Sequence, residues 1–208
     1  MGVTGVAHVE CPACGRAQDA TLVQSINART EPEAKRKLLA GELNVLACAC
    51  GRTTPLFTTM LFVDPDADLY IRVCPDGDAQ IAEAISLFRA SGATGRLRVV
   101  PSPNALREKV TIADAGLDDW AAELLKVLLL ATIGDLERIM LFDRVDCEAG
   151  VLHWLLFDET NTVPHPHQSP LAAYARIAAT AKAPPATEMQ IDRAWALTAA
   201  QALISGGN

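Results

Sequence analysis

The chain has 208 residues and a mass of 22.2 kDa; half of its residues are hydrophobic and 21% are charged. This composition is that of an ordinary globular protein and excludes a low-complexity or collagen-like chain. The formal net charge of −7 argues against a general nucleic-acid binder, because neutralising phosphates needs a clustered Lys/Arg surface.

The first residues, MGVTGVAHVE, contain neither a basic region nor a long apolar run, so we expect no signal peptide. The longest apolar stretch, residues 127–133, is too short to span a bilayer core of about 30 Å. We therefore expect no membrane association and a cytoplasmic location. In that compartment clustered cysteines are more often metal ligands or redox groups than disulfides.

The first half of the chain alternates strand and helix patterns. A helix is expected at residues 30–41, with Thr30 as N-cap, Glu33 completing a capping box and Gly41 ending it. Strands are expected around it and after it, followed by two further helices. The expected strands are residues 20–27, 43–51, 54–63, 67–74 and 96–102, and the helices are 78–92 and 102–116.

The second half begins with a long helix at residues 117–130, whose broad apolar face we expect to form the main core contact. Residues 138–146 and 150–158 predict a hairpin, and the proline-rich segment 163–170 predicts a surface loop. Two helices complete the chain. The last one, from about residue 187 to 204, is a reasonable surface for self-association or a protein partner, although packing on its own domain is the simpler reading.

GLDDW and the nearby REK are the densest polar clusters of the sequence. Asp118 and Asp119 are adjacent carboxylates of a kind used in acid–base or magnesium chemistry, but capping of the following helix is the simpler interpretation. Glu123 and Lys126 are then expected on the solvated face of that helix. No phosphate-binding loop, nucleophile elbow or His-Glu-x-x-His motif occurs, so we lean against an enzyme without excluding one.

Two cysteine pairs, each followed by glycine, carry the strongest chemical signal. Cys11 and Cys14 lie in CPACG, and Cys48 and Cys50 lie in CACG. A Cys-x-x-Cys-Gly turn commonly supplies two of the four ligands of a structural zinc ion, because its backbone N–H groups point at the sulfurs. The pattern predicts one four-cysteine zinc site. Four thiolates leave no open position for a reactive water, so the predicted role is structural.

The second pair has one residue between its cysteines instead of two, which leaves other readings open. Cys48 and Cys50 are alternatively small buried residues, or a reactive dithiol in a redox sensor. Cys74 and Cys147 are single cysteines, for which packing in the core is the expected role.

Several segments in this order resemble the CpXC family of bacterial and archaeal proteins, which is named for two Cys-Pro-x-Cys motifs. They are CPACG, SINARTEPEAKRKLLAGELNV, CACG, LFVDPDADL and LRVVPSPNALREKVTIADAGLDDWAAELLK, within residues 8–130. The resemblance implies a zinc-ribbon-like domain whose ligands fall on Cys11, Cys14, Cys48 and Cys50. The second motif here lacks the proline and one residue.

We therefore predict an α+β protein: a zinc-ribbon-like antiparallel β unit with inserted helices at residues 5–132, and a hairpin with a helical pair packed on it at residues 133–208. The predicted function is a zinc-binding scaffold or an interaction or regulatory protein with a structural metal site. The alternatives are an enzyme or small-molecule-binding protein with an unrecognised site, or a thiol redox sensor using Cys48 and Cys50.

Overall fold

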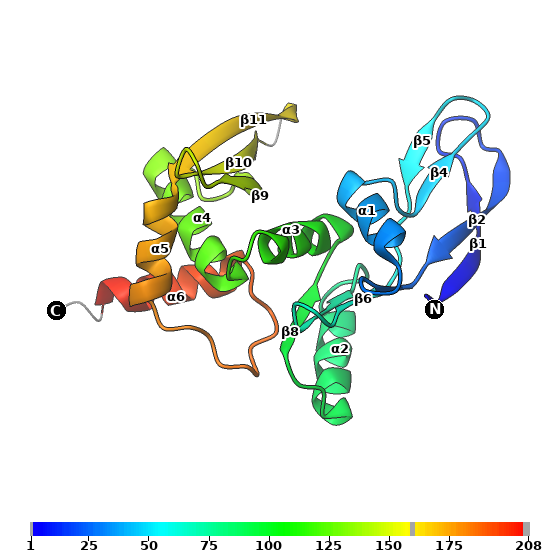
Figure 1. The fold of residues 1–208 in the computed structure, drawn as a ribbon. Coiled ribbons are helices and arrows are strands. Elements are labelled where there is room, and N and C mark those ends of the chain that lie inside the picture. Colours follow the sequence, from blue (N-terminus) through cyan, green and yellow to red (C-terminus); the bar gives the residue numbers. More distant parts are fainter. Residues whose placement is uncertain (1, 159–160, 206–208) are drawn as a thin grey trace. The chain divides into compact units, whose positions relative to one another are not determined.

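The computed structural model describes residues 2–158 and 161–205 and contains both helices and strands in several small sheets, which confirms the α+β class (Figure 1). The chain divides into two compact units, residues 1–107 and 108–208. The division falls inside helix α3 (Pro103–Asp114). No helix in the described part of the chain is long and apolar enough to cross a membrane.

Two antiparallel ribbons carry the cysteine pairs of the first unit. Strand β1 (Thr4–Glu10) pairs with β2 (Ala17–Val23), and β4 (Val45–Ala47) pairs with β5 (Thr53–Pro55). Each cysteine pair occupies the turn that joins the two strands of its ribbon, and the two turns lie together (Figure 1). The expected strand at residues 20–27 is in fact two strands, because β2 ends at Val23 and a separate strand follows.

A four-stranded sheet forms the rest of the first unit. Its order is β3-β6-β7-β8; the central pair is antiparallel and both outer pairs are parallel. The buried residues alternate along β6 and β7, which places apolar side chains such as Phe62 and Ile71 on one face. The strands are β3 (Ser25–Asn27), β6 (Met60–Asp64), β7 (Leu69–Val73) and β8 (Arg96–Val100).

Helices α1 (Pro32–Ala40) and α2 (Asp78–Ser91) occupy the long connections of this sheet. The N-cap of α1 is Glu31 instead of Thr30, and no side chain closes a capping box. Glu33 pairs with Arg36 at 2.8 Å, so its carboxylate is engaged outside the predicted box. The predicted end of the helix is correct: Gly41 has a φ of 72°, in the left-handed region that suits glycine.

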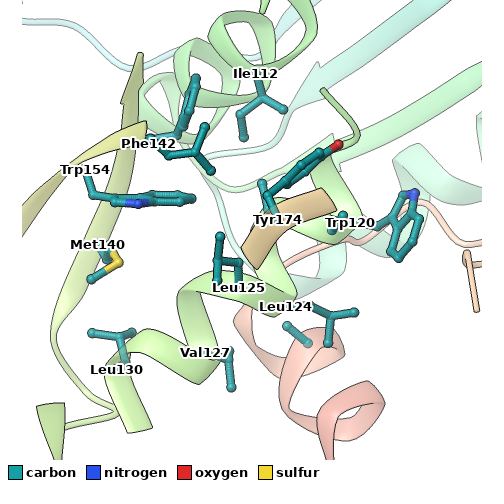
Figure 2. Packing of buried hydrophobic residues seen from close by; sticks show 14 of the residues in the cluster. Ile112, Trp120, Leu124, Leu125, Val127, Leu130, Met140, Phe142, Trp154 and Tyr174 are labelled. Atoms are coloured by element: carbon teal, nitrogen blue, oxygen red, sulfur yellow. The ribbon is translucent and has the colours of Figure 1, made fainter. Parts of the chain in front are cut away.

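The second unit packs its helices on one face of a three-stranded antiparallel sheet of order β11-β10-β9. Helix α4 (Asp119–Ile133) supplies much of the core, although Leu128, which the apolar pattern places on the buried face, is 38% exposed. Figure 2 shows Leu125 and Leu130 of α4 facing the sheet that carries Trp154. The other elements are β9 (Ile139–Asp146), β10 (Val151–Asp158), β11 (Asn161–Pro170), α5 (Leu171–Thr180) and α6 (Arg193–Ser205).

Trp154 is the centre of this core. It is 1% exposed, its ring meets Phe142 edge to face with centroids 5.5 Å apart, and its indole N–H donates to Ser169 Oγ at 2.9 Å. A buried indole needs such a partner, because an unsatisfied buried donor is costly.

The predicted hairpin β9–β10 is present, but the predicted surface loop after it is wrong. Residues 161–170 form the edge strand β11, in register with β10. The prolines concealed this strand. Pro164, Pro166 and Pro170 are separated by two and four residues and therefore share one side of the strand. Their missing N–H groups all fall on the side away from β10, where no ladder hydrogen bond is lost.

The last helix begins later than predicted. Asp192 ends the extended segment before it: its carboxylate accepts from Trp195 N at 3.0 Å, and its carbonyl accepts from Ala196 N at 2.9 Å. Ile191 and Ala196 are almost fully buried, so much of the apolar surface of this region packs within the second unit.

Candidate metal centre

The first cysteine turn is closed by backbone hydrogen bonds. Cys11 N donates to Arg16 O at 3.0 Å, and Gly15 N donates to Cys11 O at 2.9 Å. Gly15 has a φ of 69°, and a Cβ there would meet nothing within 4 Å, so the glycine is needed for its backbone conformation. The turn thereby directs the side chains of Cys11 and Cys14 to one side.

The second turn closes in the same way with one residue fewer. Cys48 N donates to Arg52 O and Gly51 N donates to Cys48 O, both at 2.9 Å, and Gly51 has a φ of 86°. In the sequence, the shorter spacing of this pair left other interpretations open. The shorter turn makes the same two closing hydrogen bonds as the first turn, and each of them spans one residue fewer.

The structure brings the four predicted cysteines together. Cys11 Sγ lies 3.7 Å from Cys50 Sγ, and Cys14 Sγ lies 3.6 Å from Cys48 Sγ. All four sulfurs lie within 4.8 Å of one another. Zinc–sulfur bonds of about 2.3 Å at tetrahedral angles separate neighbouring sulfurs by about 3.8 Å. The cluster therefore has the dimensions of a four-thiolate metal site.

The four thiols differ in exposure. Cys11 and Cys48 are buried, whereas Cys14 and Cys50 are exposed. The site is thus open to solvent on one side, where a metal ion can enter, and walled by protein on the other.

The thiols also differ in acidity. Hydrogen bonds from the Ala13 and Cys14 backbone N–H groups lower the pKa of Cys11 to about 6, against the opposing effect of burial. The Cys50 N–H lowers the pKa of Cys48, but the neighbouring thiols and burial outweigh it and raise that pKa to about 11. Cys11 is therefore more acidic than Cys48, and hydrogen bonds with the thiols of Cys48 and Cys14 add to the lowering of its pKa.

The other cysteines stand apart from this centre. Cys74 is fully buried, as predicted, but Cys147 is exposed in the turn between β9 and β10, so the prediction that it packs in the core is wrong. Among the residues that the structure describes, Cys11, Cys14, Cys48 and Cys50 are the one group of three or more potential ligands close enough to hold a metal ion. The carboxylates considered for magnesium do not form such a group.

Those carboxylates have a different environment from the one predicted. Asp119, Glu123 and Lys126 are all buried, and they join Glu108 and Lys109 of α3 in one ionic network. The prediction of a solvated helix face is therefore wrong. Asp118 precedes the helix, but its side chain makes no capping hydrogen bond.

The contacts of this network are short. Lys109 Nζ lies 2.9 Å from Asp119 Oδ2, and Lys126 Nζ lies 2.9 Å from Glu108 Oε1 and 3.0 Å from Glu123 Oε1. Backbone groups complete it: Lys109 donates to Ile191 O at 2.7 Å, and Phe142 N donates to Glu108 Oε1 at 2.7 Å. The network therefore ties α3 to the sheet and to the segment before α6.

Two pKa shifts follow from its composition of three carboxylates and two amines. Burial raises the pKa of Glu123, although Lys126 and Lys109 oppose this effect. Burial alone lowers the pKa of Lys126, but Glu108 and Glu123 outweigh it and raise the pKa. The negative charge of Glu108 acts in the same direction as burial and also raises the pKa of Glu123.

Two ribbons that present four clustered cysteines, attached to a small mixed sheet with helices, define an α+β protein with a candidate four-thiolate metal centre. A family model described as CpXC protein matches residues 9–126, which is more than half of the chain and includes both cysteine pairs. The chain belongs to the CpXC family, as its motifs indicated. Comparison with curated proteins and with solved structures gave no match.

Proposed function

We propose that the four cysteines bind one zinc ion, which holds the two ribbons together as a structural element of a scaffold or regulatory protein. The observation that supports this most is the sulfur geometry, with separations of 3.6 and 3.7 Å between the two turns. These values lie close to the edge of about 3.8 Å in a zinc–sulfur tetrahedron.

The ligand type favours zinc over magnesium or calcium. Soft thiolates select zinc, copper(I) or iron–sulfur clusters, whereas carboxylates and carbonyls suit magnesium and calcium. Backbone N–H groups that lower the pKa of Cys11 favour the thiolate form that a metal requires. Four protein ligands complete the tetrahedron, so the ion supplies stability in place of an activated water.

The fold supports a structural role because the second ribbon is short. Strands β4 and β5 have three residues each, and an isolated two-stranded ribbon is marginally stable at best in water. Metal ligation at its tip supplies the missing stabilisation. Order in residues 45–55 is therefore expected to depend on the ion.

The scaffold role requires a partner, and we propose a protein partner or a second copy of the chain. Helix α6 is a candidate surface, since Leu203 near its end is 43% exposed and continues the side on which Ala196 and Ala200 are buried. Light scattering and affinity capture followed by mass spectrometry test this part of the proposal. A monomer that captures no protein from its host contradicts it.

The metal part is tested by analysis of protein purified without added zinc. We expect about one zinc per chain, and loss of that zinc in a Cys14→Ser/Cys50→Ser variant. These two cysteines are exposed, so the substitution spares the buried core. Cys147→Ser is the matched control and should retain the metal. Folded wild-type protein without zinc contradicts the proposal.

A thiol redox sensor is the second candidate, because Cys14 and Cys50 are exposed while their nearest sulfurs are under 4 Å away. A sensor loses two electrons per disulfide to mild peroxide and recovers with a thiol reductant. A zinc site with a structural role resists the same treatment. Reversible oxidation of zinc-loaded protein within minutes favours the sensor.

A further inference from the structure

A cavity of about 120 Å³ lies in the first unit, apart from the cysteine turns. It is bounded by the end of α1, the base of the β4–β5 ribbon, the chain before β6 and the start of α3. Most of its wall is apolar. The apolar lining includes Leu38, Leu56 and Met60, and the polar lining includes Asn44, Asn104 and Arg107.

Arg107 is the one charged residue among the described residues that line this cavity. Its Nη1 lies 3.0 Å from the place where a Cβ on Gly41 would stand, so the glycine at the end of α1 leaves room for the guanidinium. The guanidinium group keeps its charge at any physiological pH and has a planar set of donors that matches a carboxylate. The cavity thus combines an apolar wall with one fixed positive charge.

Two features show that the wall is preformed and open on one side. The Asn44 side chain is held by two hydrogen bonds to Val23, at 2.7 and 3.0 Å, so it forms a fixed part of the lining. Phe57 is 63% exposed, although it belongs to the lining. An apolar ligand in the cavity would cover part of this exposed ring.

We propose that this cavity binds a small aliphatic monocarboxylate, with the carboxylate on Arg107 and the alkyl group against Leu38, Leu56 and Met60. Its volume sets the size of the ligand. An engineered apolar cavity of about 150 Å³ holds benzene, so a cavity of this size takes an alkyl group of about four or five carbons. The charge of Arg107 selects an acid over a neutral molecule of the same shape.

Isovalerate and its amide, isovaleramide, form the matched pair of probes. We expect titration of the zinc-loaded full chain with isovalerate to shift backbone amide NMR signals at residues 38–44, 56–60 and 104–107. The amide should bind about tenfold more weakly, since a charge-assisted pair is replaced by a neutral hydrogen bond. Absence of shifts at these residues, or equal affinity for the two probes, overturns the proposal.

Two variants locate the site. Arg107→Gln should bring the affinities for acid and amide to within about twofold of each other, because the charge that separates them is removed. Arg89→Gln changes the net charge equally from an exposed position on α2 and should preserve the preference. Acid preference that survives in Arg107→Gln overturns the assignment.

A third variant keeps the test decisive if Arg107→Gln fails to fold. Asn104 is exposed at the second position of α3 and lines the cavity, so Asn104→Trp fills the mouth without disturbing the core. Binding of isovalerate should then weaken by more than about tenfold. Unchanged binding in the folded Asn104→Trp protein contradicts the site, whatever the behaviour of the arginine variant.

Discussion

Asn44 and Val23 are joined by a pair of hydrogen bonds: Val23 N donates to Asn44 Oδ1 at 2.7 Å, and Asn44 Nδ2 donates to Val23 O at 3.0 Å. The Asn44 side chain, at the base of the second ribbon, thereby pairs with both backbone groups of Val23, the last residue of β2. Asn44 also has a φ of 53°, which asparagine tolerates better than most residues. The two ribbons are thus linked at this residue as well as at the cysteines.

Asn44→Ala should loosen that link. We expect the unfolding free energy to fall by about 1–3 kcal/mol, because two hydrogen bonds disappear and the new residue is strained at positive φ. The measurement is the rate of zinc transfer to a coloured chelator, which should rise. Asn44→Gly loses the same hydrogen bonds without strain and should have a smaller effect. Equal rates in wild type and Asn44→Ala contradict the link.

Oxidation of metal-free protein should join the two turns. The shortest sulfur distances pair Cys11 with Cys50 and Cys14 with Cys48. Each disulfide forms when two thiols give up two protons and two electrons, which reduce one hydrogen peroxide to two waters. Peptide mapping should recover these two crosslinks, and zinc should slow their formation. A dominant Cys48–Cys50 crosslink contradicts this pairing.

Lys126→Met should destabilise the second unit by about 3–5 kcal/mol, because it leaves Glu108 and Glu123 buried without their nearest cation. Tryptophan fluorescence during urea unfolding measures this effect, since Trp120, Trp154 and Trp195 all belong to the second unit. Adding Glu123→Gln to Lys126→Met should recover part of the loss. An unfolding free energy of Lys126→Met within about 0.5 kcal/mol of the wild-type value contradicts a buried ionic network.

Glu123→Gln should change how stability depends on pH. The folded pKa of Glu123 is raised, so above the unfolded value of about 4.3 the folded state holds a proton that the unfolded state has released. The unfolding free energy of wild type should therefore fall, relative to Glu123→Gln, as pH rises from about 4.3 through the folded pKa. Glu148→Gln, at an exposed turn position, is the control and should follow wild type. Parallel curves for wild type and Glu123→Gln contradict the raised pKa.

Removal of residues 186–208 should disrupt the second unit while zinc binding persists. The deletion takes away Ile191, whose side chain is buried and whose carbonyl accepts from Lys109. We expect loss of the near-ultraviolet circular dichroism signal of Trp154, with about one zinc still bound per chain. Loss of zinc together with that signal contradicts independent behaviour of the two units.

The four-cysteine site could be predicted from the sequence because its motifs are short. Cys11, Cys14, Cys48 and Cys50 each lie next to or near a glycine in a short turn, and turn geometry depends on few residues. The family motifs between the two pairs supplied the rest. Closure of the shorter second turn was missed because it depends on backbone hydrogen bonds to Arg52, which composition does not reveal.

The ionic network was misread because its partners come from two helices. Asp119, Glu123 and Lys126 are four and three residues apart and thus share one helix face, which alone suggests a solvated stripe. These charges can be buried because Glu108 and Lys109 pack against that stripe and pair with its charged groups.

Strand β11 was not predicted, because proline is depleted in strands unless it lies at an edge.

The prolines of β11 have a consequence for how this molecule meets others. A growing sheet, whether in an aggregate or in a complex that adds a strand, needs N–H donors along the edge it extends. Pro164 and Pro166 remove two of these donors from the free edge of β11. The protein is thereby guarded against fibre formation and strand addition on that side.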